Sequence, residues 1–319
     1  MKKISVITGI YNEAETVQEV YDVIKNIFAA SKEEYDYEHI FMDNCSTDET
    51  VSILKKIAAR DGRVKILIYS KNFGPLKSEL VGYAYATGDA VISYEANLKD
   101  PPELIQAFLK HWEGGYEVVY GVRTRTNDFF LMRWMRRIFY RTLNRVSEED
   151  LPLDAGAFRL VDRKVVNELI KLDDYKPYIR GLITSIGFKQ IGIKYIRKPR
   201  KRGVSKNTLK SLIDFAINAI IGYSIAPMRL CVLIGMALSF FGFFTALVYL
   251  ALKLSIWHAQ VPAVAGLIIL ILIFFGAQFF FLGVIGEYIA AIHSQVRKKP
   301  FVVIREKINF NENQKIMLP

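Results

Sequence analysis

The chain has 319 residues, of which 51% are hydrophobic and 24% are charged, and its formal net charge is +11. This length suits one large domain or two modest ones, and the excess of Lys and Arg implies an anionic partner or surface. Cys45 and Cys231 lie far apart in the sequence, which argues against a disulfide framework. Two long apolar runs lie beside basic clusters near the C-terminus, which favours lipid headgroups over nucleic acid as that partner.

The first hundred residues alternate between apolar, β-branched segments and segments with helical spacing. Strands are predicted at residues 4–10, 39–42, 64–69 and 91–94, with helices at 14–30, 50–59 and 75–87 between them. This alternation predicts a parallel, doubly wound α/β sheet. No Gly-x-Gly-x-x-Gly follows the first strand and no Gly-Lys-Ser/Thr loop occurs, which disfavours a Rossmann dehydrogenase or a P-loop enzyme.

Two later stretches are strongly basic. Residues 123–145 carry Arg at roughly helical intervals among aromatic residues, and residues 189–210 contain nine Lys or Arg and no acid. The first stretch could bind nucleic acid, although a role facing headgroups is favoured next to a membrane anchor. Most basic residues of the second stretch are expected to contact lipid, with Arg200 and Lys206 as candidates for a binding site.

The C-terminal third predicts a membrane anchor. Residues 230–252 and 261–285 form two uncharged runs, each long enough for the ~30 Å hydrocarbon core of a bilayer. Their short connection predicts a helical hairpin, and the basic residues on both flanks place the soluble part in the cytoplasm. The alternative is a buried two-helix core. We therefore expect a soluble domain at 1–206, an amphipathic interfacial helix at 207–228, membrane helices within 229–288 and a cytoplasmic tail at 289–319.

Polar residues follow the first two predicted strands directly. Tyr11 and Glu13 end the first, and Asp43 ends the second. The carboxyl ends of parallel strands meet at one edge of a sheet, so an aromatic face and two carboxylates would lie together there. Such a set can stack on a nucleobase and accept hydrogen bonds from a base or ribose. Helix capping explains both carboxylates equally well.

The motifs occur in a characteristic order. They are Tyr11-Asn12-Glu13, Asp43-Asn44-Cys45-Ser46-Thr47-Asp48, Asn72-Phe73-Gly74, Glu95-Ala96-Asn97-Leu98-Lys99-Asp100-Pro101-Pro102-Glu103, Phe158-Arg159-Leu160-Val161-Asp162-Arg163 and Gly283-Val284-Ile285-Gly286-Glu287-Tyr288. In order and spacing the set resembles family 2 glycosyltransferases. It is most similar to their polyprenyl-phosphate branch, which includes bactoprenol glucosyltransferases and dolichol-phosphate mannose synthases.

The resemblance implies a GT-A domain that passes a hexose, with inversion, from a nucleotide-sugar (UDP-linked in our expectation) to a polyprenyl phosphate such as undecaprenyl phosphate. The product would serve surface glycan or lipid modification at the inner membrane. Carried over by motif, the nucleotide-binding residues are Tyr11, Glu13, Asp43 and Asn72, the acceptor- and phosphate-binding residues are Arg159, Arg200 and Lys206, and the catalytic residues are Glu95, Asn97, Lys99, Arg200 and Lys206. A lipid phosphate is already an anion near neutral pH, so no general base is nominated.

The chain departs from the family at its metal motif. Glu95 and Asn97 stand where the family has Asp-x-Asp, and Lys99 replaces the usual glutamine. Mg²⁺ and Mn²⁺ prefer hard carboxylate oxygens, so we expect weakened metal use at Glu95 and Asn97. Lys99 could instead replace part of the metal's charge, or catalysis could be lost.

Two rival functions follow from these features. A chain without an efficient metal motif could be a nucleotide-binding membrane scaffold. A processive polysaccharide synthase is disfavoured by only two predicted spans and by the lack of a Gln-x-x-Arg-Trp segment. Glycines in the apolar runs would allow close helix packing in a homo-oligomer.

Overall fold

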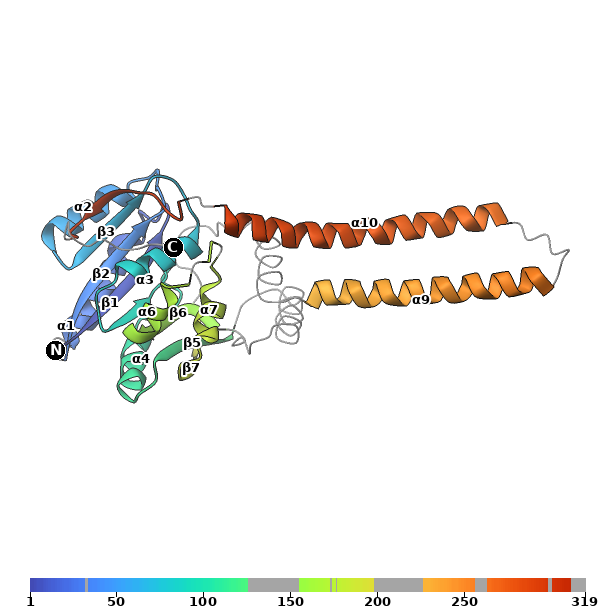
Figure 1. Ribbon diagram of the computed structural model, residues 1–319. Helices are drawn as coiled ribbons and strands as arrows, with labels where there is room; N and C mark the ends of the chain where they lie inside the picture. The colour runs from blue at the N-terminus through green and yellow to red at the C-terminus, as the bar shows by residue number, and fades with distance from the viewer. Residues whose placement is uncertain are drawn as a thin grey trace. The chain divides into compact units, whose positions relative to one another are not determined.

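In the computed structural model, the residues described are 1–31, 34–125, 155–172, 174–175, 177–197, 226–255, 263–297 and 300–310. The chain forms two compact units (Figure 1). One is an α/β domain that contains the N-terminal residues and also residues 300–310. The other contains the two long C-terminal helices.

An eight-stranded sheet forms the centre of the α/β domain, with the order β7-β5-β6-β4-β1-β2-β3-β8. The strands are β1 (Lys2–Ile10), β2 (Tyr35–Asp43), β3 (Val64–Tyr69), β4 (Ala90–Ser93), β5 (Val118–Arg125), β6 (Ala155–Asp162), β7 (Gln190–Ile196) and β8 (Ile304–Ile308). Strands β3, β2, β1 and β4 pair in parallel, which confirms the prediction for the first hundred residues. Strands β6 and β8 pair antiparallel with their neighbours, so the sheet as a whole is mixed.

The helices cover both faces of this sheet. They are α1 (Val17–Ala30), α2 (Thr50–Arg60), α3 (Pro75–Tyr85), α4 (Leu104–Glu113), α6 (Arg163–Leu169) and α7 (Ile179–Ser185). Side chains from α1, α2 and α4 share one hydrophobic cluster with the sheet. Helix α3 lies on the other face, where a Cβ at Gly82 would come 2.8 Å from the Met42 side chain and 3.2 Å from Ile7. Gly82 therefore allows α3 to lie directly on β1 and β2.

Burial on both faces fixes the central strands. In β1, Ile4 and Val6 belong to the hydrophobic cluster shared with α1, α2 and α4, while Ile7 faces α3. All three are at most 1% exposed. Burying a side chain of this size contributes about 1.5–3 kcal/mol, so the apolar run is held firmly in register. Tyr11 and Glu13 follow the last residue of β1, and Asp43 is the last residue of β2, which places all three at the carboxyl edge of the sheet.

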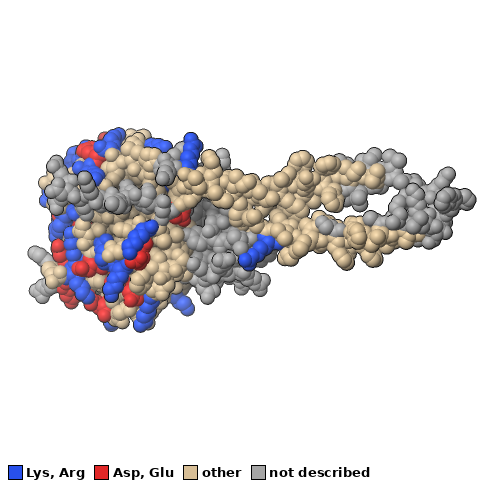
Figure 2. Space-filling model, in the orientation of Figure 1, with Lys and Arg blue, Asp and Glu red and all other residues tan. Residues whose placement is uncertain are grey.

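The second unit contains α9 (Ala226–Ser255) and α10 (Ala263–Val296). Both are long and apolar enough to cross a membrane, with candidate spans at Pro227–Thr245 and Phe274–Val296. Their mean hydropathies are 1.8 and 1.6, and neither window is buried within the chain. In Figure 2 they are drawn almost entirely without charged side chains, whereas Lys, Arg, Asp and Glu cover the α/β domain. The two expected apolar helices are thus confirmed.

The C-terminal residues differ from the expected tail. Helix α10 continues to Val296, and residues 304–308 form the edge strand β8 beside β3. In β8, Ile304, Glu306 and Ile308 are half-buried and the residues between them are exposed. This alternation suits a strand with one covered face. The predicted interfacial helix at 207–228 lies, except for its last three residues, outside the described residues.

Candidate functional site

Four parallel strands end at the same edge of the sheet. Ile10 of β1 pairs with Asp43 of β2, Asp43 pairs with Ile68 of β3, and Ile7 of β1 pairs with Ser93 of β4. The loops at residues 11–16, 44–49, 70–74 and 94–103 therefore leave the sheet side by side. All four motifs singled out in the N-terminal third of the sequence lie on these loops.

The loops after β1 and β2 are joined by hydrogen bonds. The backbone N–H of Asn12 donates to Ser46 Oγ at 2.9 Å, and the side-chain Oδ1 of Asn12 accepts from the backbone N–H of Thr47 at 2.8 Å. The Glu13 amide donates to Thr50 Oγ1 at 2.9 Å. Asn12 has a φ of 52°, in the left-handed region where asparagine is tolerated better than most residues. Ser46 and Thr50 thus hold the loops in place.

The predicted nucleotide-binding residues lie around these loops. Tyr11 and Glu13 are half-buried, and Thr16 Oγ1 donates to Glu13 Oε2 at 3.1 Å. Asp43 is fully buried and accepts from the amide and hydroxyl of Ser46. Burial raises the pKa of Asp43, although the Ser46 hydrogen bonds work against that rise. The structure brings Tyr11, Glu13 and Asp43 to one edge, where Glu13 accepts from the Thr16 hydroxyl and Asp43 closes a turn to Ser46.

Asn72 lies on the neighbouring loop. Its side chain is exposed, and its Oδ1 accepts from the Gly74 amide at 2.9 Å. Gly74 has a φ of 87° and precedes Pro75, the first residue of α3. Glycine takes this φ at little steric cost, and proline suits the first turn of a helix. The loop is also tied to the end of β2, because the Phe73 amide donates to Asn44 Oδ1.

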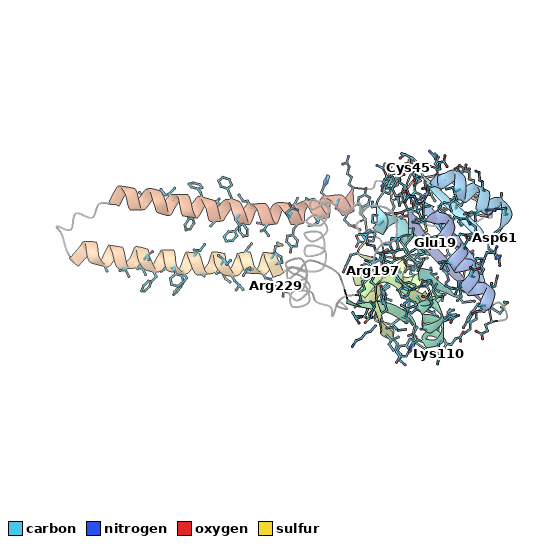
Figure 3. All side chains as sticks on the ribbon, turned by 180° about the vertical axis from the view of Figure 1, so that it is seen from behind. Glu19, Cys45, Asp61, Lys110, Arg197 and Arg229 are labelled. Atoms are coloured by element: carbon cyan, nitrogen blue, oxygen red, sulfur yellow. The ribbon has the colours of Figure 1, made fainter. Side chains whose placement is uncertain are left out.

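A second cluster surrounds Glu95, just beyond the end of β4. Arg197 Nη2 lies 2.6 Å from Glu95 Oε2, and Arg123 Nη2 lies 3.7 Å from Glu95 Oε1. Asn97 Nδ2 donates to Glu95 Oε2 at 2.6 Å, while Asn97 Oδ1 accepts from the Lys99 amide at 3.1 Å. Arg197 follows β7, and Figure 3 labels it among the side chains of the α/β domain. Both possible metal ligands are therefore already engaged with donors of this chain.

The buried carboxylate of Asp100 holds Arg197 in place. Arg197 Nε donates to Asp100 Oδ1 at 3.1 Å, and the Tyr195 hydroxyl donates to the same oxygen. Asp100 is 1% exposed. Space for Tyr195 comes from Gly121, where a Cβ would lie 2.6 Å from the Tyr195 ring. A buried carboxylate on the 94–103 loop, a buried tyrosine and a glycine thus fix the position of one guanidinium.

Opposite charges keep Glu95 ionised. Burial opposes its ionisation, but Arg197 and Arg123 hold the pKa of Glu95 below its ordinary value. Burial and the nearby Asp100 raise the pKa of Tyr195 to about 12, so its hydroxyl stays protonated and continues to donate. Glu95 is therefore a charged carboxylate that faces two guanidiniums.

These residues do not fit a resident divalent cation. In the part of the chain that the structure describes, no group of three or more His, Cys, Asp or Glu side chains has metal-ligating geometry. Mg²⁺ and Mn²⁺ need several free oxygen ligands. Here Glu95 is the sole carboxylate of the expected motif, and its oxygens face two guanidiniums and an amide.

The remaining predicted residues are placed as follows. Lys99 is half-buried on the same loop as Glu95. Arg159, on β6, is 3% exposed and donates to the carbonyl oxygens of Gly156 and Ala157. It therefore lies beneath the surface, and its predicted role at the acceptor phosphate stays a prediction. Arg200 and Lys206 lie outside the described residues.

Motif reasoning missed four residues that complete the second cluster: Arg123, Asp100, Tyr195 and Arg197. Asp100 lies within a quoted motif, but its role depends on β7, which was not predicted as a strand. Arg197 was visible only as one cation in a basic stretch. The useful signal was the alternation Ile191, Ile193, Tyr195 at the start of that stretch, which is typical of a strand.

Comparison with known proteins identifies the family. Residues 5–170 match the model described as "Glycosyl transferase family 2", which covers more than half of the chain. The chain belongs to this family. It is therefore a glycosyltransferase with a GT-A fold, and the resemblance drawn from the ordered motifs is confirmed.

Relatives of this family 2 glycosyltransferase match over almost its whole length. The glycosyltransferase YkcC of Bacillus subtilis is 36% identical over 313 residues, which is 98% of this chain and 96% of the relative. The bactoprenol glucosyl transferase of Shigella phage SfV is 29% identical over 98% of this chain and 100% of its own. Among solved structures, the mannosyltransferase PcManGT of Pyrobaculum calidifontis, in complex with GDP-Man and Mn²⁺, is 18% identical. That match has a TM-score of 0.46 and covers 93% of this chain and 88% of the other.

Proposed function

We propose that this glycosyltransferase transfers a hexose from a UDP-linked sugar to a polyprenyl phosphate, with inversion, at the cytoplasmic face of the cell membrane. The observation that carries the proposal is the full-length match to bactoprenol glucosyl transferases, which extends through the two apolar helices. A lipid acceptor requires the α/β domain to work at a bilayer. The two apolar helices, α9 and α10, would anchor the chain in that bilayer.

The topology is consistent with a membrane hairpin. The α/β domain contains residues before α9 and residues after α10, including β8. If both helices cross the bilayer, the chain leaves and re-enters the membrane on the side where this domain lies. Basic residues flank the outer ends of the hairpin, with Arg229 at the start of α9 (Figure 3) and Arg297-Lys298-Lys299 after α10. The positive-inside rule then places this side in the cytoplasm.

The proposed reaction needs two anions to meet. An oxygen of the lipid phosphate attacks the anomeric carbon, the bond from that carbon to the diphosphate oxygen breaks, and its electron pair leaves with the nucleoside diphosphate. No proton has to be removed from the attacking oxygen. The protein's task is to align the reactants and stabilise the charge on the departing group. Tyr11 and Glu13 would bind the nucleoside, and the cations near Glu95 would face the diphosphate.

Mg²⁺ or Mn²⁺ at Glu95 and Asn97 was the ion expected from the sequence. No step of the proposed reaction depends on it, because the residues at this position do not fit a resident cation. The proposed acceptor-binding cations, Arg200 and Lys206, lie in the basic stretch that precedes α9. Their position in the sequence would bring them close to the membrane surface.

The test measures release of UDP by the full-length protein in detergent. A panel of UDP-sugars is supplied with and without undecaprenyl phosphate. We expect release with one or a few donors that depends on the lipid. The proposal fails if no donor gives lipid-dependent release.

A nucleotide-binding membrane scaffold is the second candidate. The altered metal motif favours it, because Glu95 and Asn97 already bond to other groups of the chain. Binding of UDP without transfer from any donor would support this function. The variant Tyr11→Ala should weaken UDP binding about tenfold under either function, because base stacking is worth about 1–3 kcal/mol, and so tests where the nucleotide binds.

A further inference from the structure

The cluster around Glu95 contains as many guanidiniums as carboxylates. Glu95 and Asp100 face Arg123 and Arg197, with N–O distances between 2.6 and 3.7 Å. Asn97, at the second position of the expected metal motif, adds no charge. A divalent cation brought to this cluster would meet two positive groups within the same few ångströms. A diphosphate brought there would meet two donors whose geometry suits phosphate oxygens.

The two guanidiniums are held in different ways. Arg197 is bound through Nε to the buried Asp100, while its Nη2 contacts Glu95, which is 31% exposed at the side chain. Arg123 Nε donates to the Tyr195 hydroxyl at 3.3 Å, and its Nη2 is buried without a hydrogen-bond partner among the described residues. One nitrogen of each side chain is therefore anchored. Nη2 of Arg197 contacts the part-exposed Glu95, and Nη2 of Arg123 has no hydrogen bond among the described residues that would have to be broken. A guanidinium held in this way needs little reorganisation to bind an incoming anion.

We propose that Arg197 and Arg123 bind the diphosphate of the donor directly and take the place of a divalent cation in this chain. The inference rests on the proposed function, since it concerns the donor of that reaction. The incoming diphosphate displaces Glu95 from Arg197 Nη2, and Asp100 keeps the guanidinium in place. When the anomeric bond breaks, the two arginines stabilise the negative charge on the departing diphosphate.

Asp100 and Tyr195 act as positioning residues. They touch Arg197 and Arg123 and have no expected contact with the donor. Tyr195→Phe removes the hydroxyl that links Arg123 to Asp100. We expect it to weaken UDP binding by a few-fold, while Asp100→Asn has a larger effect because it also removes the charge that holds Arg197.

The first test measures UDP affinity by calorimetry on the full-length protein in detergent, with Mn²⁺ or with EDTA. The wild type should bind UDP equally well, within twofold, under both conditions. Arg197→Gln should weaken binding at least tenfold, and Arg60→Gln, an exposed arginine on α2, is the matched control that should leave it unchanged. If EDTA weakens wild-type binding tenfold, or if Arg197→Gln has no effect, the inference is overturned. The inference is also overturned if no nucleoside diphosphate binds.

The second test measures Mn²⁺ itself by electron paramagnetic resonance in the presence of UDP. The wild type should bind Mn²⁺ no more tightly than free UDP does. The double variant N97D/R197Q frees Glu95 and restores a second carboxylate, so it should bind Mn²⁺ at least tenfold more tightly. Stoichiometric Mn²⁺ binding by the wild type would overturn the inference. This measurement uses only the wild-type protein, so it does not depend on whether a variant folds.

Failure of the inference and failure of the proposed function give different results. If no sugar reaches undecaprenyl phosphate, the proposed function fails, while UDP and Mn²⁺ binding still report on the arginines. If transfer proceeds but stops in EDTA and the wild type binds Mn²⁺, the function stands and the inference falls.

Discussion

Replacing Glu38 by glutamine should destabilise the α/β domain much more at neutral pH than in acid. Glu38 lies in β2, and its side chain is 2% exposed. It accepts hydrogen bonds from the Ser5 hydroxyl at 2.6 Å, the Thr87 amide at 2.7 Å and Lys65 Nζ at 2.7 Å. These groups belong to β1, β3 and the turn before β4. One carboxylate thus joins three of the strands that carry the site to the turn before the fourth.

The magnitude follows from the pKa of Glu38. Burial opposes ionisation, but Lys65, Ser5 and Thr87 outweigh it and lower the pKa from 4.5 to about 2. One pKa unit corresponds to about 1.4 kcal/mol, so the ionised carboxylate contributes about 3 kcal/mol of stability. Because the folded-state pKa is the lower one, this contribution is complete above pH 4.5 and is lost as the pH falls towards 2.

The assay is urea unfolding of the full-length protein in detergent, followed by tryptophan fluorescence between pH 7 and pH 3. At pH 7 the variant Glu38→Gln should be about 3 kcal/mol less stable than the wild type, and the difference should shrink as the pH falls below 4.5. Glu113→Gln, which alters a carboxylate with a 41% exposed side chain, is the control. A constant difference between wild type and Glu38→Gln across this range would refute the reasoning.

Three further outcomes are expected. Tyr11→Ala should weaken UDP binding about tenfold in calorimetry, because base stacking is worth about 1–3 kcal/mol, whereas Tyr11→Phe should stay within twofold; equal affinities would refute a stacking role. Gly121→Ala should displace Tyr195 and lower UDP affinity without loss of the fold by circular dichroism; unchanged affinity would contradict this positioning. Asn309→Ala removes hydrogen bonds to two backbone carbonyls and should speed hydrogen exchange in β8; unchanged protection would show that β8 is held otherwise.

The first half of the fold could be predicted because its signals are local. Apolar segments such as 4–10 and 64–69 end in polar residues, and the helices between them have regular apolar spacing. Alternation of strand and helix then determines the parallel order from β3 to β4. The two long apolar helices were equally clear, since length and composition alone define them.

Other parts depend on contacts that local patterns do not contain. Strand β8 follows two long helices, and it is a strand because the edge of β3 is available to pair with it. The same limit applied to the site. Glu95 was found by its motif, but its partners Arg123 and Arg197 lie 28 and 102 residues further along the chain. Only the pairing of β5 with β7 brings these two arginines together.

The most direct test of the proposed function is mass spectrometry of the lipid product. Full-length protein is incubated with undecaprenyl phosphate and UDP-glucose, then with other UDP-sugars, and the lipid fraction is analysed. The account predicts undecaprenyl phosphate that carries one hexose, formed in proportion to the UDP released. Undecaprenyl phosphate that remains unmodified with every donor, in a protein that binds UDP, would contradict it.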